Sequence, residues 1–281
     1  MSARGLAKRI LPPALIDAGR RLNMPGSKEW VYMPSGWEEC DGSGTGWNVA
    51  SVVTAETAKW STFLRLAAGT GPLGIAHEAC LPSRLDPAAH NAVMTYGYVL
   101  ARAAYDKGSI SVLDWGGGLA HYYVFSRALL PNIELKYVCR DLPLMCEAGR
   151  RLLSDVVFCD DDVGLIGKSF DLTHAGTSLQ YARDWRGALA VLASVTSSYL
   201  YVARLPVVER SHEFVVVQRA HRYGYDTQYA CWYLPRGDFV LHAASCGLHL
   251  EREFVMMDRP YVHGAPEQGE YRGFLFQRAV M

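Results

Sequence analysis

The sequence lacks the features that mark several large classes of protein. Its 28 basic residues are matched by 28 acidic ones, whereas proteins that bind nucleic acid usually carry a basic excess that neutralises phosphates. It also lacks any run of about 18 apolar residues, the length that a membrane-spanning helix needs. No internal repeat and no low-complexity tract occurs among its 281 residues. We therefore expect neither a nucleic-acid partner nor a membrane span.

The seven cysteines are not arranged for metal binding or for a disulfide framework. No two of them are spaced C-x-x-C, and their number is odd. Zinc sites usually need clustered pairs of ligands, and the disulfide frameworks of secreted proteins usually need an even number of cysteines. We therefore expect free thiols, no metal ion and a cytoplasmic location, with most cysteines packed as small apolar side chains.

The first 21 residues contain five basic side chains and raise the question of a targeting segment. Pro12, Pro13 and Asp17 interrupt the apolar stretch that a secretory signal peptide requires, so we expect no such signal. A solvated terminal helix is the simplest interpretation of this segment. Contact of its basic side chains with an anionic membrane surface is the alternative.

From residue 110 onward, short apolar runs alternate with stretches of helical periodicity, in a chain that is 50% hydrophobic and 20% charged. Strands are predicted at 111–115, 135–139, 156–159, 170–174, 199–203, 248–255 and 271–278, and helices at 119–130, 143–153, 185–195 and 236–246. The last two strands have no helix between them and can pair antiparallel. The pattern predicts an α/β, Rossmann-like fold, a doubly wound three-layer sandwich on a mostly parallel seven-stranded sheet with an antiparallel last strand.

The chain before this pattern has a different character. Residues 24–54 are rich in Gly, Ser, Pro and Trp, which favours ordered loops, and helices are predicted at 55–68 and 87–106. We expect residues 1–107 to form a helical and loop cap over the ligand cleft, and residues 108–281 to form the sheet domain. An insertion at about 206–235 is too long for an ordinary connection and contains Val215–Val217, which predict an extra strand.

Three glycines follow the first strand of the sheet. Gly116, Gly117 and Gly118 let the backbone turn tightly and approach a ligand closely, and Asp114 lies two residues before them. A nicotinamide dinucleotide site expects G-x-G-x-x-G, with the pyrophosphate at the helix N-terminus. Here the third glycine of that pattern is missing, and the anionic Asp114 would repel a pyrophosphate. An acid at this position suits a cationic ligand, such as one that carries an ammonium group.

Acidic residues also follow the second and third strands. Asp141 comes 27 residues after Asp114, where a carboxylate can accept both hydroxyls of a ribose; capping of the next helix is the alternative role. Asp160, Asp161 and Asp162 follow the third strand, where one carboxylate can accept the amino group of an adenine. In an α/β sheet, ligands bind beyond the carboxyl ends of the strands, so these acids are expected to meet at one cleft.

This set of residues resembles the class I S-adenosylmethionine-dependent methyltransferases. More closely, the whole chain is similar to a little-characterised bacterial group of methyltransferases found near polysaccharide and natural-product genes. The matching segments are residues 36–39, 46–47, 114–118, 178–181, 204–206, 217–218 and 231–233. The resemblance implies an S-adenosylmethionine cofactor held by Asp114, Gly116, Gly117, Gly118, Asp141, Leu142, Asp160 or Asp161, and Ser178.

For the reaction itself, we expect methyl transfer to a small molecule, a sugar or a natural product, with oxygen as the preferred acceptor atom; the resemblance says little about the acceptor. His174 and His221 are the candidate bases, a buried and hydrogen-bonded core histidine is the alternative for His174, and Gln180, which cannot take a proton, is a candidate for orienting the substrate. The candidate acceptor-binding residues are Tyr181, Arg204, Tyr225 and Trp232. A nicotinamide-dependent oxidoreductase and a non-catalytic cofactor-binding relative stay open as alternatives, as does a homodimer.

Overall fold

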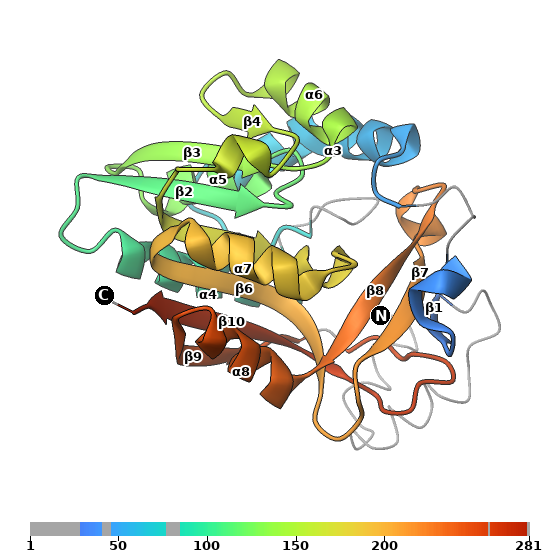
Figure 1. Cartoon of the computed structure of the whole chain (residues 1–281). Coiled ribbons are helices and arrows are strands. Elements are labelled where there is room, and N and C mark those ends of the chain that lie inside the picture. The colour runs from blue at the N-terminus through green and yellow to red at the C-terminus, as the bar shows by residue number, and fades with distance from the viewer. Residues whose placement is uncertain (1–28, 41–45, 77–84, 258, 280–281) are drawn as a thin grey trace, which may run out of the picture.

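The structure is a computed structural model that describes residues 29–40, 46–76, 85–257 and 259–279 (Figure 1). The helix expected in the basic N-terminal segment lies outside these residues. The helices are α3 (Ala50–Ala67), α4 (Pro87–Ala103), α5 (His121–Leu129), α6 (Pro143–Leu152), α7 (Trp185–Ser194) and α8 (Arg236–Ser245). The strands are β1 (Trp30–Met33), β2 (Ser109–Trp115), β3 (Glu134–Arg140), β4 (Val157–Cys159), β5 (Phe170–Gly176), β6 (Thr196–Val208), β7 (Phe214–Arg219), β8 (Gln228–Pro235), β9 (Leu248–Val255) and β10 (Glu270–Arg278).

The central part of the sheet is parallel, as the alternation of strands and helices predicts. Its strands stand in the order β4-β3-β2-β5-β6, and each neighbouring pair is parallel. Beyond β6, the strand β10 pairs antiparallel with both β6 and β9, which confirms the antiparallel pairing expected for the last two strands. The chain leaves β2 toward β3 on one side and later returns to β5 on the other. The carboxyl ends of β2 and β5 therefore form the point where strand order reverses, the usual ligand position in such a sheet.

The described sheet has ten strands, and the expected number of seven is wrong. The long strand β6 runs past β5, and its end pairs with β8. β8 in turn pairs antiparallel with β7, the extra strand expected around Val215–Val217, and β7 pairs antiparallel with β1. An N-terminal strand thus belongs to the same sheet as the later strands. The division of the chain near residue 107 stays a prediction.

Helices cover both faces of the sheet, which gives the expected three layers. Figure 1 shows α7 and α8 in front of the sheet and α4 and α5 behind it. On β2, Leu113 and Trp115 pack into the core that α7 and α8 cover, whereas Ile110 and Val112 pack into the core on the other face. Because side chains alternate along a strand, odd-numbered residues near the end of β2 meet the layer of α7 and α8, and even-numbered residues meet the layer of α4 and α5.

Within the described residues, no helix is both long enough and apolar enough to cross a membrane. The helices instead bury one apolar stripe each. On α4 the stripe includes Val93, Tyr96 and Leu100, and the helix begins at Pro87 after Asp86, whose side chain accepts the N–H of Ala89 at 2.9 Å.

Candidate functional site

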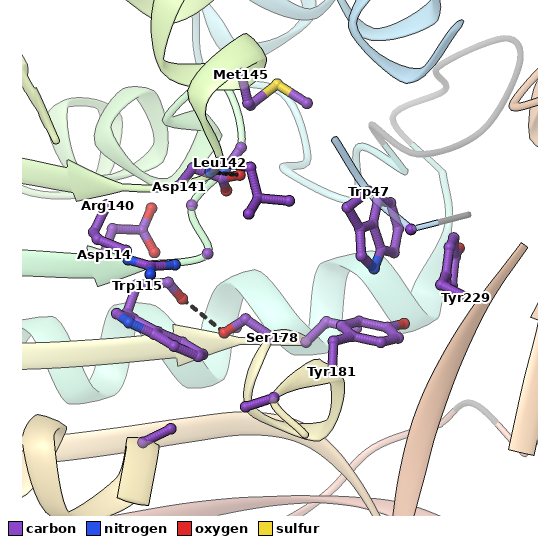
Figure 2. A pocket seen from close by; sticks show the side chains of 18 of the residues that line it. Trp47, Asp114, Trp115, Arg140, Asp141, Leu142, Met145, Ser178, Tyr181 and Tyr229 are labelled. Carbon is purple, nitrogen blue, oxygen red and sulfur yellow. Dashed lines mark hydrogen bonds between the residues drawn. The ribbon is translucent and has the colours of Figure 1, made fainter. Parts of the chain in front are cut away.

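A cavity of about 840 Å³ lies at the carboxyl ends of β2 and β5. Its wall includes the glycine turn Gly116–Gly118 after β2 and residues Gly176–Ser178 after β5. Helix α3 contributes Val52 and Glu56, and β8 contributes Tyr229 and Ala230. This volume is within the range of roughly 300–1,000 Å³ that small-molecule and cofactor sites occupy. The cavity is therefore the candidate functional site, at the place that the strand order predicts (Figure 2).

The glycine turn needs its glycines for steric reasons. Gly116 has a φ of +74°, and a Cβ there would lie 2.3 Å from Cβ of Ser178. A Cβ at Gly117 would lie 2.4 Å from a carboxylate oxygen of Asp114. Ser178 Oγ donates a 2.6 Å hydrogen bond to the carbonyl oxygen of Trp115, drawn as a dashed line in Figure 2. This bond fastens the turn after β5 to the turn after β2, so both turns form one rigid edge of the cavity.

Asp141 connects the end of β3 with the glycine turn. One oxygen of its carboxylate accepts the N–H of Gly118 at 2.7 Å, and the other accepts the N–H of Leu142 at 2.7 Å. Burial raises the pKa of Asp141 above its ordinary value, and the two N–H groups oppose this rise. Each carboxylate oxygen has two lone pairs, so Asp141 can hold the turn and still accept hydrogen bonds from a ligand. Asp141 and Leu142 lie together at the cavity wall in Figure 2.

Asp114 is oriented into the core beneath the turn. Its exposed fraction is 1%; Tyr137 donates its hydroxyl hydrogen to Oδ2 at 2.8 Å, and Nδ1 of His174 lies 2.9 Å from Oδ1. Asp114 stands two residues after Val112 on β2 and therefore faces the same side of the sheet, the core covered by α4 and α5. Burial, with the charge of Asp114 as the next cause, raises the pKa of Tyr137 well above its ordinary value, which keeps that hydroxyl protonated. Both oxygens of the acid expected to meet an ammonium group thus already have protein partners.

None of the three candidate catalytic residues lines the 840 Å³ cavity or the smaller one, of about 240 Å³, beside it. His174 is completely buried among tyrosine rings and is hydrogen-bonded to Asp114, so it orients that acid and does not meet an acceptor. His221 is exposed on the surface. Gln180 is 1% exposed, and within the described part of the chain neither atom of its amide has a hydrogen-bond partner. We therefore do not retain His174, Gln180 or His221 as catalytic groups.

A different acid from those expected reaches the cavity after β4. Asp160 and Asp161 are exposed, and it is Asp162 that lines the cavity. Asp162 accepts the indole N–H of Trp115 at 3.1 Å, and Nε of Arg140 lies 2.8 Å from the same oxygen. The sequence analysis assigned the adenine amino group to Asp160 or Asp161, and the structure places Asp162 at the cavity instead. In a run of three identical residues, the sequence alone does not tell which one the turn directs inward.

Aromatic side chains form the other end of the cavity. The rings of Trp47 and Tyr229 are stacked with their centroids 4.0 Å apart, and Tyr181 meets both rings edge-on at 5.2 Å. Figure 2 shows these three side chains grouped on the side opposite Asp114. Together with Tyr225, they also line a second cavity of about 240 Å³, so they form a wall that the two cavities share.

Trp232 borders neither of these cavities. Its ring packs against Trp37 at 5.7 Å, and its N–H donates to the carbonyl of Arg183, so its assignment to acceptor binding is corrected.

Arg204 lines the smaller cavity because the strand is irregular there. It has a φ of +54°, and the pairing of β6 with β10 shifts register between Arg272 and Phe274, opposite this point. A bulge of this kind redirects a side chain, and strained backbone at a non-glycine residue often marks a functional site. Thr177, with a φ of +58°, borders both cavities and donates its N–H to the carbonyl of Ala203 at 2.9 Å.

Glu56 is a cavity residue that the sequence analysis missed. It lies on α3 with an exposed fraction of 6%, and Tyr225 donates its hydroxyl hydrogen to Glu56 Oε1. Lys59 Nζ contacts the same oxygen at 2.5 Å, and Nε2 of the buried His121 lies 3.7 Å from Oε2. A signal for this role is present in the sequence. Glu56 stands at the helical spacing of Val52 and Trp60, on the stripe of α3 that is buried.

The comparisons with known proteins gave similarity only to solved structures. No family model matches the chain, and no curated protein matches it. One solved structure is a magnesium protoporphyrin IX methyltransferase from Synechocystis PCC 6803 with bound SAM, at 14% identity over 81% of this chain and 95% of that one, with a TM-score of 0.47. A second is a 1,6-didemethyltoxoflavin-N1-methyltransferase from Burkholderia thailandensis, at 15% identity over 67% and 79%, with a TM-score of 0.46.

A third is the sugar N-methyltransferase from Streptoalloteichus sp ATCC 53650, at 17% identity over 67% of this chain and 87% of that one, with a TM-score of 0.42. With identities and TM-scores this low, we draw no conclusion about this chain's activity from these neighbours. The ligand and the reaction are therefore argued from the residues of the chain itself.

Proposed function

We propose that the protein is an S-adenosylmethionine-dependent methyltransferase that acts on a small molecule. The observation that carries the proposal is that acids at the ends of three successive strands border one cavity. Asp114 stands near the end of β2, Asp141 follows β3 and Asp162 follows β4, and all three line the 840 Å³ cavity together with the glycine turn. The acids after β3 and β4 match the ribose hydroxyls and the adenine amino group of a nucleoside, and the acid in β2 fixes the turn beside them through the core.

The cavity residues fit this cofactor by their chemistry. Asp141 can accept the ribose hydroxyls, Leu142 and Met145 offer an apolar surface for the adenine, and Asp162 can accept its amino group. Gly118 lines the cavity, and a Cβ built there would meet Nδ1 of His121 at 3.8 Å, an ordinary contact distance. The methionine part of the cofactor can therefore lie against the turn. When bound, S-adenosylmethionine supplies a methyl group that is activated by its positively charged sulfur.

The residues of the chain then have to align the acceptor with that methyl group and exclude water. Positioning of this kind can contribute on the order of 7–11 kcal/mol to lowering a barrier. The rigid edge made by Ser178 and Trp115 holds one side of the site, and the aromatic wall closes the other.

We place the acceptor at the aromatic end of the cavity. Tyr181 and Tyr225 offer ring faces there, and Arg204 lines the smaller cavity that shares this wall. This environment suits a ring-shaped acceptor such as a sugar or an aromatic natural product, with oxygen as the preferred atom. Because Trp47 and Glu56 come from the N-terminal part of the chain, we propose that residues 1–107 contribute to acceptor selection. The cytoplasmic location and a homodimer stay predictions.

Isothermal titration calorimetry with S-adenosylhomocysteine tests this proposal. The folded wild-type protein should bind it, and Asp141→Asn should weaken binding by roughly tenfold or more, because a charged acceptor of hydrogen bonds is lost. Asp155→Asn, an exposed acid that does not border the cavity, is the matched control and should bind like the wild type. Folded protein that binds NADH in a fluorescence titration, and not S-adenosylhomocysteine, would overturn the proposal in favour of an oxidoreductase.

A further inference from the structure

The acids that border the large cavity differ in how many hydrogen bonds and ion pairs their carboxylate oxygens already make within the protein. Asp114 is held in the core by Tyr137 and His174, and Asp162 is held by Trp115 and Arg140. Asp184 caps α7 by accepting the N–H of Gly187 at 2.9 Å. Asp141 binds two backbone N–H groups at the ribose side of the turn. These roles leave Glu56 on α3 as the acid to consider for a cationic group of the ligand.

The two oxygens of Glu56 are engaged unequally. Oε1 accepts from Tyr225 and contacts Lys59 at 2.5 Å. Oε2 has, within the described residues, only the contact with His121 at 3.7 Å, which is longer than a hydrogen bond. A buried carboxylate is stable only when it is paired and hydrogen-bonded, and Oε2 lacks a short partner of this kind. Glu56 is thus held in place through one oxygen, and its other oxygen is directed toward His121.

His121 connects this oxygen with the glycine turn. It is the first residue of α5, it is buried, and it borders the same cavity. Its Nδ1 would lie 3.8 Å from a Cβ at Gly118, and its Nε2 lies 3.7 Å from Oε2 of Glu56. The ring of His121 therefore lies between Oε2 of Glu56 and the turn against which the methionine part of the cofactor is proposed to lie.

We propose that Glu56, with His121 beside it, recognises the ammonium group of the cofactor's amino-acid chain, the role that the sequence assigned to Asp114. The inference rests on the proposed function, because it names the residue that reads one part of the same cofactor. Charge-assisted hydrogen bonds between a carboxylate and an ammonium group are among the stronger ones, and the low exposure of Glu56 strengthens the pairing. Lys59 and Tyr225 act as positioning residues. Both contact Oε1 of Glu56 and so fix the carboxylate, whereas the ammonium group is proposed to bind Oε2.

A pair of ligands separates this role from the rest of the site. S-adenosylhomocysteine carries the amino-acid chain, whereas 5′-methylthioadenosine has the same adenine, ribose and thioether without it. We expect Glu56→Gln to weaken binding of S-adenosylhomocysteine by roughly 10- to 100-fold, since a charged hydrogen bond is lost. The same substitution should leave binding of 5′-methylthioadenosine within about twofold of the wild type. Asp141→Asn, at the ribose, should weaken both ligands.

Asp86→Asn is the matched control for loss of a negative charge outside the cavity. Asparagine caps a helix about as well as aspartate, so α4 keeps its first turn, and both ligands should bind as they do to the wild type. The inference is overturned if Glu56→Gln, folded by circular dichroism, changes neither ligand or weakens both equally. A wild-type protein that binds neither ligand would instead contradict the proposed function itself.

Discussion

The carboxylate of Asp141, after β3, accepts a 2.7 Å hydrogen bond from the backbone N–H of Gly118, after β2. Two turns that are separated by a helix and a strand in the sequence are thus joined at the edge of one cavity. The acid that we propose as the ribose ligand is also the acid that holds the glycine turn in shape. Ligand binding and the local order of this turn should therefore depend on the same ionisation.

Binding of S-adenosylhomocysteine should weaken at acidic pH because of Asp141. Burial raises the pKa of this carboxyl above its ordinary value, and only the ionised form accepts the ribose hydroxyls. Binding is then strongest at pH values above the raised pKa and weakens as the pH falls through it. Calorimetric titrations over a pH series check this expectation, and Asp141→Asn should bind weakly with little dependence on pH. A wild-type affinity that stays constant down to the unfolding pH would contradict it.

Replacing Gly116 by alanine should destabilise the protein. The new Cβ would lie 2.3 Å from Cβ of Ser178, and the φ of +74° is unfavourable for any residue with a Cβ. We expect a loss of about 1–3 kcal/mol in the free energy of unfolding, measured by urea denaturation. Gly237→Ala on α8 is the matched control, since a Cβ there meets nothing within 4 Å, and it should be neutral or slightly stabilising. Equal stability of the two variants would show that the turn is not strained.

His174→Ala should lower the free energy of unfolding and have little effect on binding of S-adenosylhomocysteine. The substitution removes a buried partner of Asp114 and leaves that carboxylate with Tyr137 alone. We expect the free energy of unfolding to fall by about 1–3 kcal/mol or more in urea denaturation, because a buried carboxylate loses a hydrogen-bond partner. Folded protein that remains should still bind S-adenosylhomocysteine, since His174 borders neither of the described cavities. Unchanged stability would contradict the anchoring role given to this histidine.

The sequence predicts the layers of this fold well because their signal is local. Apolar runs such as 111–115 and 199–203 become β2 and β6, and the missing helix after 255 predicts the antiparallel pair β9 and β10. By contrast, β1 has four residues and is held by its pairing with β7, almost 190 residues later, and by a bridge from Val31 to His263. A contact of that kind leaves no local periodicity in the sequence.

The sequence indicates the edge of the sheet where the candidate cavity lies, but it does not indicate which side chains face that cavity. The second half of β2 is buried on both faces, and Val112 and Leu113 place apolar side chains on opposite sides, so alternation gives no sign of which helical layer Asp114 faces. For the same reason, the sequence did not show that His174, near the end of a predicted strand, faces the core and not the cavity. Glu56 was missed although its helical spacing with Trp60 indicates a buried position, because charged residues on helices usually face solvent.

Glu267 should make the stability of the cavity's aromatic end dependent on pH. Its carboxylate accepts the backbone N–H groups of Arg210 and Ser211 at 2.9 and 2.8 Å, at the connection between β6 and β7. Burial alone would raise the pKa of Glu267, but these N–H donors outweigh it and hold the pKa below its ordinary value. The folded pKa is thus lower than the unfolded one, so this stabilisation is complete above the unfolded pKa. It is lost as the pH falls through the folded value.

We therefore expect Glu267→Gln to lower the free energy of unfolding at neutral pH and to reduce its slope between about pH 3 and 5, measured by urea denaturation. The strands β7 and β8, which begin after this connection, carry Tyr229 at the wall between the two cavities. Fluorescence of Trp47, stacked on Tyr229, should shift with the same variant if the hairpin loosens as a unit. Glu38→Gln, an exposed acid elsewhere in the described chain, is the control and should change neither measurement. A Glu267→Gln variant as stable as the wild type at pH 7 would mean that the connection is held by its other contacts.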